Sequence, residues 1–105
     1  MKFLLLLLLP AMALAGEPAY DCAGKTRFVH RGAQSTTPAD EKRSYRIDGG
    51  RLDGLACEVG ERQLSCHGLT PQQAYRRVVI DRSNGTVSDT LEMPTSMLIF
   101  EGSCK

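Results

Sequence analysis

Apolar and polar residues alternate along much of this chain, with a period that indicates extended strands. In residues 43–48, Tyr45 and Ile47 fall on one face and polar side chains on the other. Residues 75–81 are rich in β-branched side chains and give the clearest strand. Phe28 is the expected core residue of the strand at residues 25–31. The pattern predicts strands at residues 25–31, 43–48, 51–57, 75–81, 86–91 and 96–101, with another around Leu64 and Cys66.

Turn residues separate these segments. Gly49-Gly50 and Asn84-Gly85 are hairpin signals, and residues 32–42, which are polar and charged, predict a long exposed loop. Residues 71–77, preceded by Thr70 as a possible cap, could form a single helical turn. The sequence therefore predicts an all-β fold, a small antiparallel meander barrel or sandwich of seven or eight strands.

The first 15 residues differ from the rest and have the features of an export signal. Lys2 precedes an apolar run, Pro10 interrupts it, and Ala13-Leu14-Ala15 is a small-x-small cleavage pattern. We expect residues 1–15 to be a signal peptide and residues 16–105 a single β-domain. An anchor helix is the alternative, but the apolar run is short for one. The expected location is periplasmic or secreted, with no membrane span in the mature chain.

The four cysteines, Cys22, Cys57, Cys66 and Cys104, all lie in the exported part, where an oxidising compartment favours disulfides. Four cysteines allow three connectivities. A hairpin centred near Gly60 and Glu61 would place Cys57 opposite Cys66, which leaves Cys22 to pair with Cys104. A zinc site formed by Cys57, Cys66, His67 and Cys22 is the alternative, although the chain contains no C-x-x-C pair.

Charge and motifs exclude several functions. Lys and Arg number 13 and Asp and Glu 12, so no basic surplus favours nucleic acid. There is no G-x-S-x-G elbow, and residues 81–92 have Thr86 where a calcium loop needs glycine. We expect no enzyme activity, no cofactor and no metal. His30, Arg31 and His67, near the ends of expected strands, are the candidate binding residues.

Five short segments carry a resemblance: Tyr20-Asp21-Cys22, Tyr45-Arg46-Ile47-Asp48, residues 57–66, residues 80–85 and residues 100–104. They resemble segments of small exported, disulfide-containing bacterial proteins of unassigned function. The chain is also similar, more loosely, to the periplasmic C-type lysozyme inhibitors, which are small β-barrels that begin near a Y-x-C sequence. Their Ser-Gly-x-x-Tyr-type inhibitory loop is matched poorly by the residues from Ser83 to Thr86.

Three hypotheses about function follow from these features. The favoured one is a non-enzymatic module that binds or inhibits a protein or an envelope component through exposed loops on a rigid scaffold. A protein that acts like a lysozyme inhibitor would be a specific alternative of this kind. The second hypothesis is a structural or accessory envelope protein without a discrete ligand site, and the third and least favoured is an enzyme.

Overall fold

A computed structural model describes residues 19–30 and 37–105, and within these ranges the chain forms eight β-strands and no helix. None of the described residues therefore belongs to a helix that could cross a membrane. The strands are β1 (Ala19–His30), β2 (Ala39–Arg46), β3 (Arg51–Leu52), β4 (Leu55–Val59), β5 (Gln63–Leu69), β6 (Tyr75–Asp81), β7 (Thr86–Glu92) and β8 (Ser96–Cys104).

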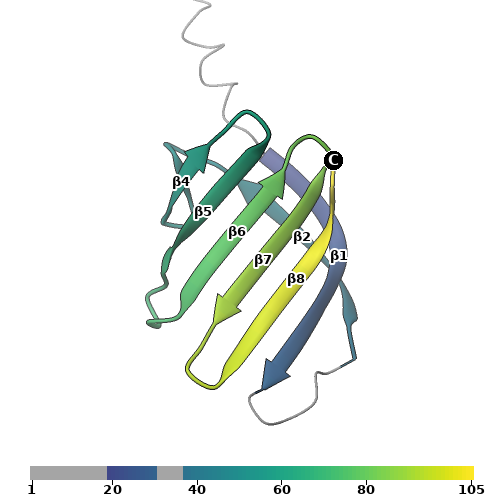
Figure 1. Ribbon diagram of the computed structural model, residues 1–105, viewed down its shortest axis with the longest axis vertical. Coiled ribbons are helices and arrows are strands. Elements are labelled where there is room, and N and C mark those ends of the chain that lie inside the picture. Colours follow the sequence, from purple (N-terminus) through teal and green to yellow (C-terminus); the bar gives the residue numbers. More distant parts are fainter. Residues whose placement is uncertain (1–18, 31–36) are drawn as a thin grey trace, which may run out of the picture.

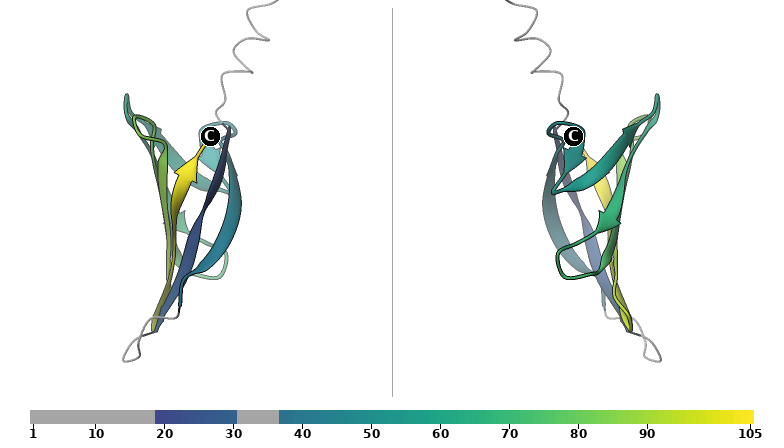
Figure 2. Two further views of the ribbon diagram at one scale, coloured as in Figure 1. Left: turned by 90° about the vertical axis from the view of Figure 1, so that its right-hand side faces the viewer. Right: turned by 90° about the vertical axis from the view of Figure 1, so that its left-hand side faces the viewer.

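All eight strands belong to one antiparallel sheet with the order β2-β1-β8-β7-β6-β5-β4-β3 (Figure 1). From β3 to β8 each strand pairs with the next one in the sequence, and β1 then pairs with β8. The sheet curls into a half-barrel, so that β1 and β2 form one wall and β6 and β7 the other (Figure 2). The predicted all-β meander is confirmed.

The two edges of the sheet, β2 and β3, are joined by a tight turn. Asp48 and Arg51 form an isolated bridge, with backbone N–O distances of 2.8 and 3.1 Å. This bridge brings the edges together near Gly49 and Gly50. Along the rest of β2, no strand of the described ranges pairs with its free edge. The wall of the half-barrel therefore has a gap beside β2.

Both predicted disulfides are present. Cys22 lies directly opposite Cys104 in the β1–β8 register, and Cys57 lies opposite Cys66 in the β4–β5 hairpin. The Cα–Cα distances are 3.9 and 4.0 Å. Because these bridges use all four cysteines, none is left as a thiolate ligand for zinc.

Two strand boundaries differ from the sequence prediction. Ala39 to Lys42 were expected in a loop, but they belong to β2 because they pair with β1. The single strand expected at residues 51–57 is a hairpin, since Asp53 and Gly54 have φ values of 49° and 85° and form a turn between β3 and β4. An Asp-Gly pair is the signal that marks such a turn.

The core lies on the inner face of the half-barrel. Tyr45 and Ile47 share this face as predicted, and each is 2% exposed. Phe28 is only partly buried, because the β1–β2 pairing ends at Thr26 and β2 does not cover the last part of β1. The buried apolar residues are Cys22, Tyr45, Ile47, Leu52, Leu55, Leu64, Cys66, Ala74, Val78, Ile80, Val87 and Phe100.

Two glycines allow β1 and β8 to approach closely beside the outer disulfide. Gly24 lies opposite Gly102, and a β-carbon at Gly24 would overlap the carbonyl oxygen of Glu101. We predict that Gly24→Ala lowers the free energy of unfolding by more than about 2 kcal/mol, because backbone rather than a flexible side chain must move. Urea unfolding measures this loss. Ser103→Ala, an exposed neighbour on β8, serves as the control, and a Gly24→Ala variant as stable as this control would refute the prediction.

Candidate functional site

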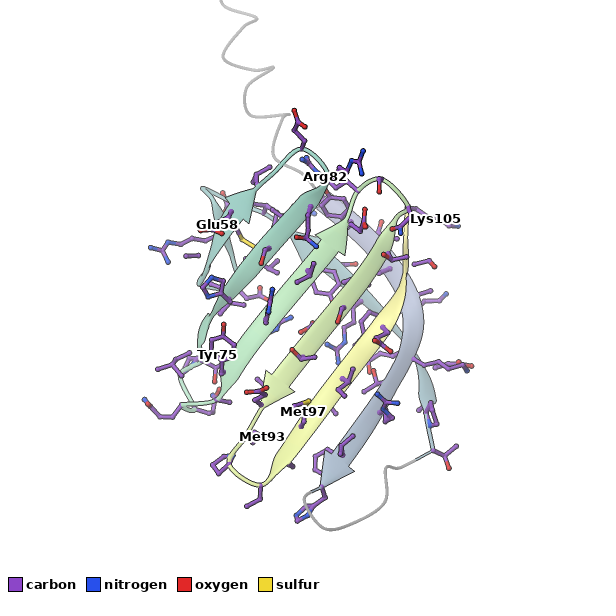
Figure 3. The ribbon with its side chains drawn as sticks, viewed as in Figure 1. Glu58, Tyr75, Arg82, Met93, Met97 and Lys105 are labelled. Atoms are coloured by element: carbon purple, nitrogen blue, oxygen red, sulfur yellow. A yellow bond between two sulfur atoms is a disulfide. The ribbon has the colours of Figure 1, made fainter. Side chains whose placement is uncertain are left out.

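The structure does not bring the predicted binding residues together. His30 is exposed at the end of β1, and Arg31 lies outside the described residues. His67 is exposed on β5, and its ring lies 6.2 Å from that of Tyr75. Figure 3 shows Tyr75 at the start of β6, at the end of that strand that lies away from Arg82. Since β8, β7 and β6 separate β1 from β5 in the sheet, the two histidines do not share a site.

A different group of residues gathers at the gap in the wall of the half-barrel. There β2 faces the end of β5 and the start of β6 across a recess of about 430 Å³ that is open to solvent. The inner faces of β7 and β8 contribute its floor. The recess is lined by Arg43, Ser44, Tyr45, Thr70, Arg76, Asp89, Leu91 and Leu98.

Asp89 is the buried centre of this recess. It occupies an inner position of β7, between Val87 and Leu91, and it is 2% exposed. Arg76 donates from Nε to Asp89 Oδ1 at 3.1 Å and from Nη2 to Oδ2 at 2.8 Å. Arg43 Nη1 and the Tyr45 hydroxyl also donate to Oδ2, each at 2.8 Å. These four bonds connect β2 to β6 and β7 across the interior, so they hold the two walls in position.

The charges at this centre fix the protonation of its members. Burial by itself would raise the pKa of Asp89, but the hydrogen bonds and charge of Arg76 outweigh it and hold that pKa below its usual value. Burial and the nearby Asp89 charge raise the pKa of the Tyr45 hydroxyl. Asp89 is therefore an anion and Tyr45 a neutral donor near neutral pH.

Each arginine has a second carboxylate partner farther from the centre. Arg43 donates from Nε to Glu41 at 2.5 Å, and its guanidinium lies 4.7 Å from the centre of the Phe100 ring. Arg76 donates from Nη1 to Asp53 at 3.1 Å. The two arginine side chains are only 21% and 20% exposed, and they are held from several sides. Both guanidiniums are therefore fixed in orientation at the surface of the recess.

This arrangement is suited to noncovalent recognition. Asp89 is a poor general base near neutral pH, because it is buried, its oxygens accept four hydrogen bonds and its pKa is lowered. A molecule entering the recess meets guanidinium N–H groups beside the apolar side chains of Leu91 and Leu98. Such a mixture of apolar walls and a few oriented polar groups is typical of ligand sites.

Sequence reasoning did not single out Arg43, Arg76 or Asp89. Strand alternation sends Arg76 and Arg77 to opposite faces of β6, and the register places Arg76 opposite Leu91 inside the half-barrel. The sequence did contain one indication of Asp89: it shares a strand face with the apolar residues Val87 and Leu91. An ionised group at an inner position needs partners, and their identity depends on the fold.

Comparisons of the chain with protein-family models, with curated protein sequences and with solved structures found no match. Within residues 19–30 and 37–105, no three His, Cys, Asp or Glu side chains form a group that could hold a metal ion. The functional inference therefore rests on the recess.

Proposed function

We infer that this chain is an exported, non-enzymatic binding module that recognises a protein or an envelope component of its compartment. The observation that carries the proposal is the recess at the gap between β2 and β6, where the guanidiniums of Arg43 and Arg76 are held by buried Asp89. Two oriented arginines beside apolar side chains form a compact recognition surface, since arginine and large apolar groups supply much of the energy of many interfaces.

The scaffold around the recess supports this inference. Two disulfides fit an oxidising compartment outside the cytoplasm, so a periplasmic or secreted location is the one that we propose. The bridges and the Asp89 hydrogen bonds also restrict motion of the strands that carry the recess. A preorganised surface loses less conformational entropy when it binds, which favours affinity in a small domain.

A photoreactive residue placed at Thr70 tests this proposal. Thr70 lines the recess from the turn after β5, where its hydroxyl accepts a hydrogen bond from the backbone of Ala74 at 3.2 Å. Thr86 is a matched control, because it is exposed at the start of β7 and also bonds within a turn, through Asn84. The labelled proteins would be irradiated in an envelope extract, with and without an excess of unlabelled protein.

We expect the Thr70 label to form a discrete adduct that unlabelled protein suppresses, and the Thr86 label to form none. An adduct of equal yield from both positions, or from Thr86 alone, would place binding elsewhere. The absence of a competed adduct from Thr70 would refute the recess as the binding site. Any captured partner can then be tested as a purified protein, and a C-type lysozyme can be assayed directly because of the resemblance noted above.

A further inference from the structure

The charged groups that line the recess are the guanidiniums of Arg43 and Arg76, which can only donate hydrogen bonds, and the buried carboxylate of Asp89. Each oxygen of Asp89 is already occupied, and together they accept four hydrogen bonds from Arg43, Tyr45 and Arg76. Asp89 is also 2% exposed and already paired with two arginines, so it is poorly placed to bind a cationic ligand. Arg43 and Arg76, in contrast, carry five N–H groups each, and only some of these are used by Asp89, Glu41 and Asp53. A ligand here therefore needs acceptor atoms.

The two outer carboxylates differ in how firmly they are held. Glu41 is 38% exposed and accepts hydrogen bonds from both Arg43 and Thr26, whereas Asp53 is 70% exposed, and neither belongs to the lining of the recess. The ion pair with so exposed a partner as Asp53 contributes little, because water and salt screen it. The Asp53 contact to Arg76 Nη1 can therefore be exchanged for a contact to another carboxylate, since the bidentate pairing with Asp89 holds Arg76 in position.

Apolar surface adjoins the donors. Leu91 lies directly opposite Arg76 in the β6–β7 register and opposite Leu98 in the β7–β8 register. Both leucines are partly buried and line the recess. A ligand that places an acceptor group on the arginines would therefore place a short chain of carbons against these two side chains.

We propose that the recess binds a carboxylate carried on a short branched apolar chain, as at the C-terminus of a partner that ends in an aliphatic residue. This inference rests on the proposed function, because it names the chemical group that the binding module recognises. A carboxylate matches the planar fork of a guanidinium and forms charge-assisted hydrogen bonds with it.

Three probes of the same shape test the proposal by NMR: 4-methylpentanoate, 4-methylpentan-1-ol and 4-methylpentan-1-amine. We expect the carboxylate to shift the backbone amides of Thr70, Arg76 and Leu91 in a saturable way, with a dissociation constant of about 1–10 mM, as suits so small a ligand. The alcohol should bind more weakly, and the amine should cause no saturable shift. Higher salt should weaken binding of the carboxylate, because it screens the attraction to the guanidiniums.

Asp53→Asn is the informative variant, because it removes the competing carboxylate from Arg76. Asparagine also tolerates the positive φ of 49° at this position, so the turn should be kept. We expect the variant to bind 4-methylpentanoate about threefold more tightly, which is the scale of an exposed ion pair. Asp40→Asn makes the same change of charge at an 87% exposed side chain that pairs with Lys25, and it should leave the affinity unchanged.

Tighter binding to Asp53→Asn alone, with the carboxylate preferred over the amine, would support the proposal. No saturable shift with 4-methylpentanoate, a preference for the amine, or weaker binding to Asp53→Asn would overturn it. These outcomes are separate from the cross-linking result. A competed adduct from Thr70 without carboxylate binding would keep the binding module and reject only this ligand.

Discussion

Asp89→Asn should lower the free energy of unfolding by about 3–5 kcal/mol, the usual cost of removing one partner from a buried ion pair. Asp89 is 2% exposed and is paired with Arg43 and Arg76 at 2.8 Å each. The amide keeps the size of the side chain but not its charge. It therefore leaves two guanidiniums close together without the anion that neutralises them. Urea unfolding at pH 7 measures the loss.

The pH dependence provides a control for this first prediction. Because the folded pKa of Asp89 is lowered, its stabilisation is complete above its unfolded value of about 4 and is lost as pH falls through the folded pKa. The difference in stability between wild type and Asp89→Asn should therefore shrink below about pH 4. A variant as stable as wild type at pH 7, or a difference that grows in acid, would show that Asp89 is not a paired anion.

Replacing both Cys22 and Cys104 with alanine should also cause a large loss of folding stability. This bridge spans a sequence separation of 82 residues, against 9 for the Cys57–Cys66 bridge. On the loop-entropy model the outer bridge contributes about 4.5 kcal/mol and the inner one about 2.7 kcal/mol. The outer bridge also joins β1 to β8, the pairing that places β1 and β2 opposite β6 and β7. Its loss should leave much of a domain of this size unfolded at 37 °C.

The matched comparison is the double alanine variant of Cys57 and Cys66, measured by thermal and urea unfolding under the same conditions. Both variants remove one bridge between directly opposed strand positions, and each bridge includes a buried cysteine. We expect the outer variant to be less stable by about 2 kcal/mol. Equal stabilities, or a larger loss in the inner variant, would contradict the entropic reason for this order.

Local signals predicted much of the fold. Residues 75–81 form β6 as expected, because their β-branched side chains favour a strand whose inner face is buried. Asn84-Gly85 marks the turn between β6 and β7, and the spacing of Cys57 and Cys66 gave the inner disulfide. In these segments the partner is close in sequence, so local pattern and tertiary structure agree.

Long-range pairing explains what the sequence did not reveal. Ala39 to Lys42 are mainly charged, and this composition predicted a loop. They form the first half of β2 because they pair with β1. Asp89 and Arg43 are 46 positions apart, and no local pattern connects them. The sequence shows a charged residue at an inner strand position but not which side chains pair with it. The recess could therefore be identified only from the folded half-barrel.

The central claim is that hydrogen bonds to Asp89 fix the orientation of the Arg43 and Arg76 guanidiniums. The most direct test is ¹⁵N NMR of the arginine side chains. Hydrogen bonds that fix a guanidinium slow rotation of its two Nη groups, which then give separate signals. We predict separate Nη signals for Arg43 and Arg76 in the wild type and averaged signals in Asp89→Asn. Exposed Arg46 should be averaged in both proteins. Averaged signals for Arg43 and Arg76 in the wild type would contradict the claim.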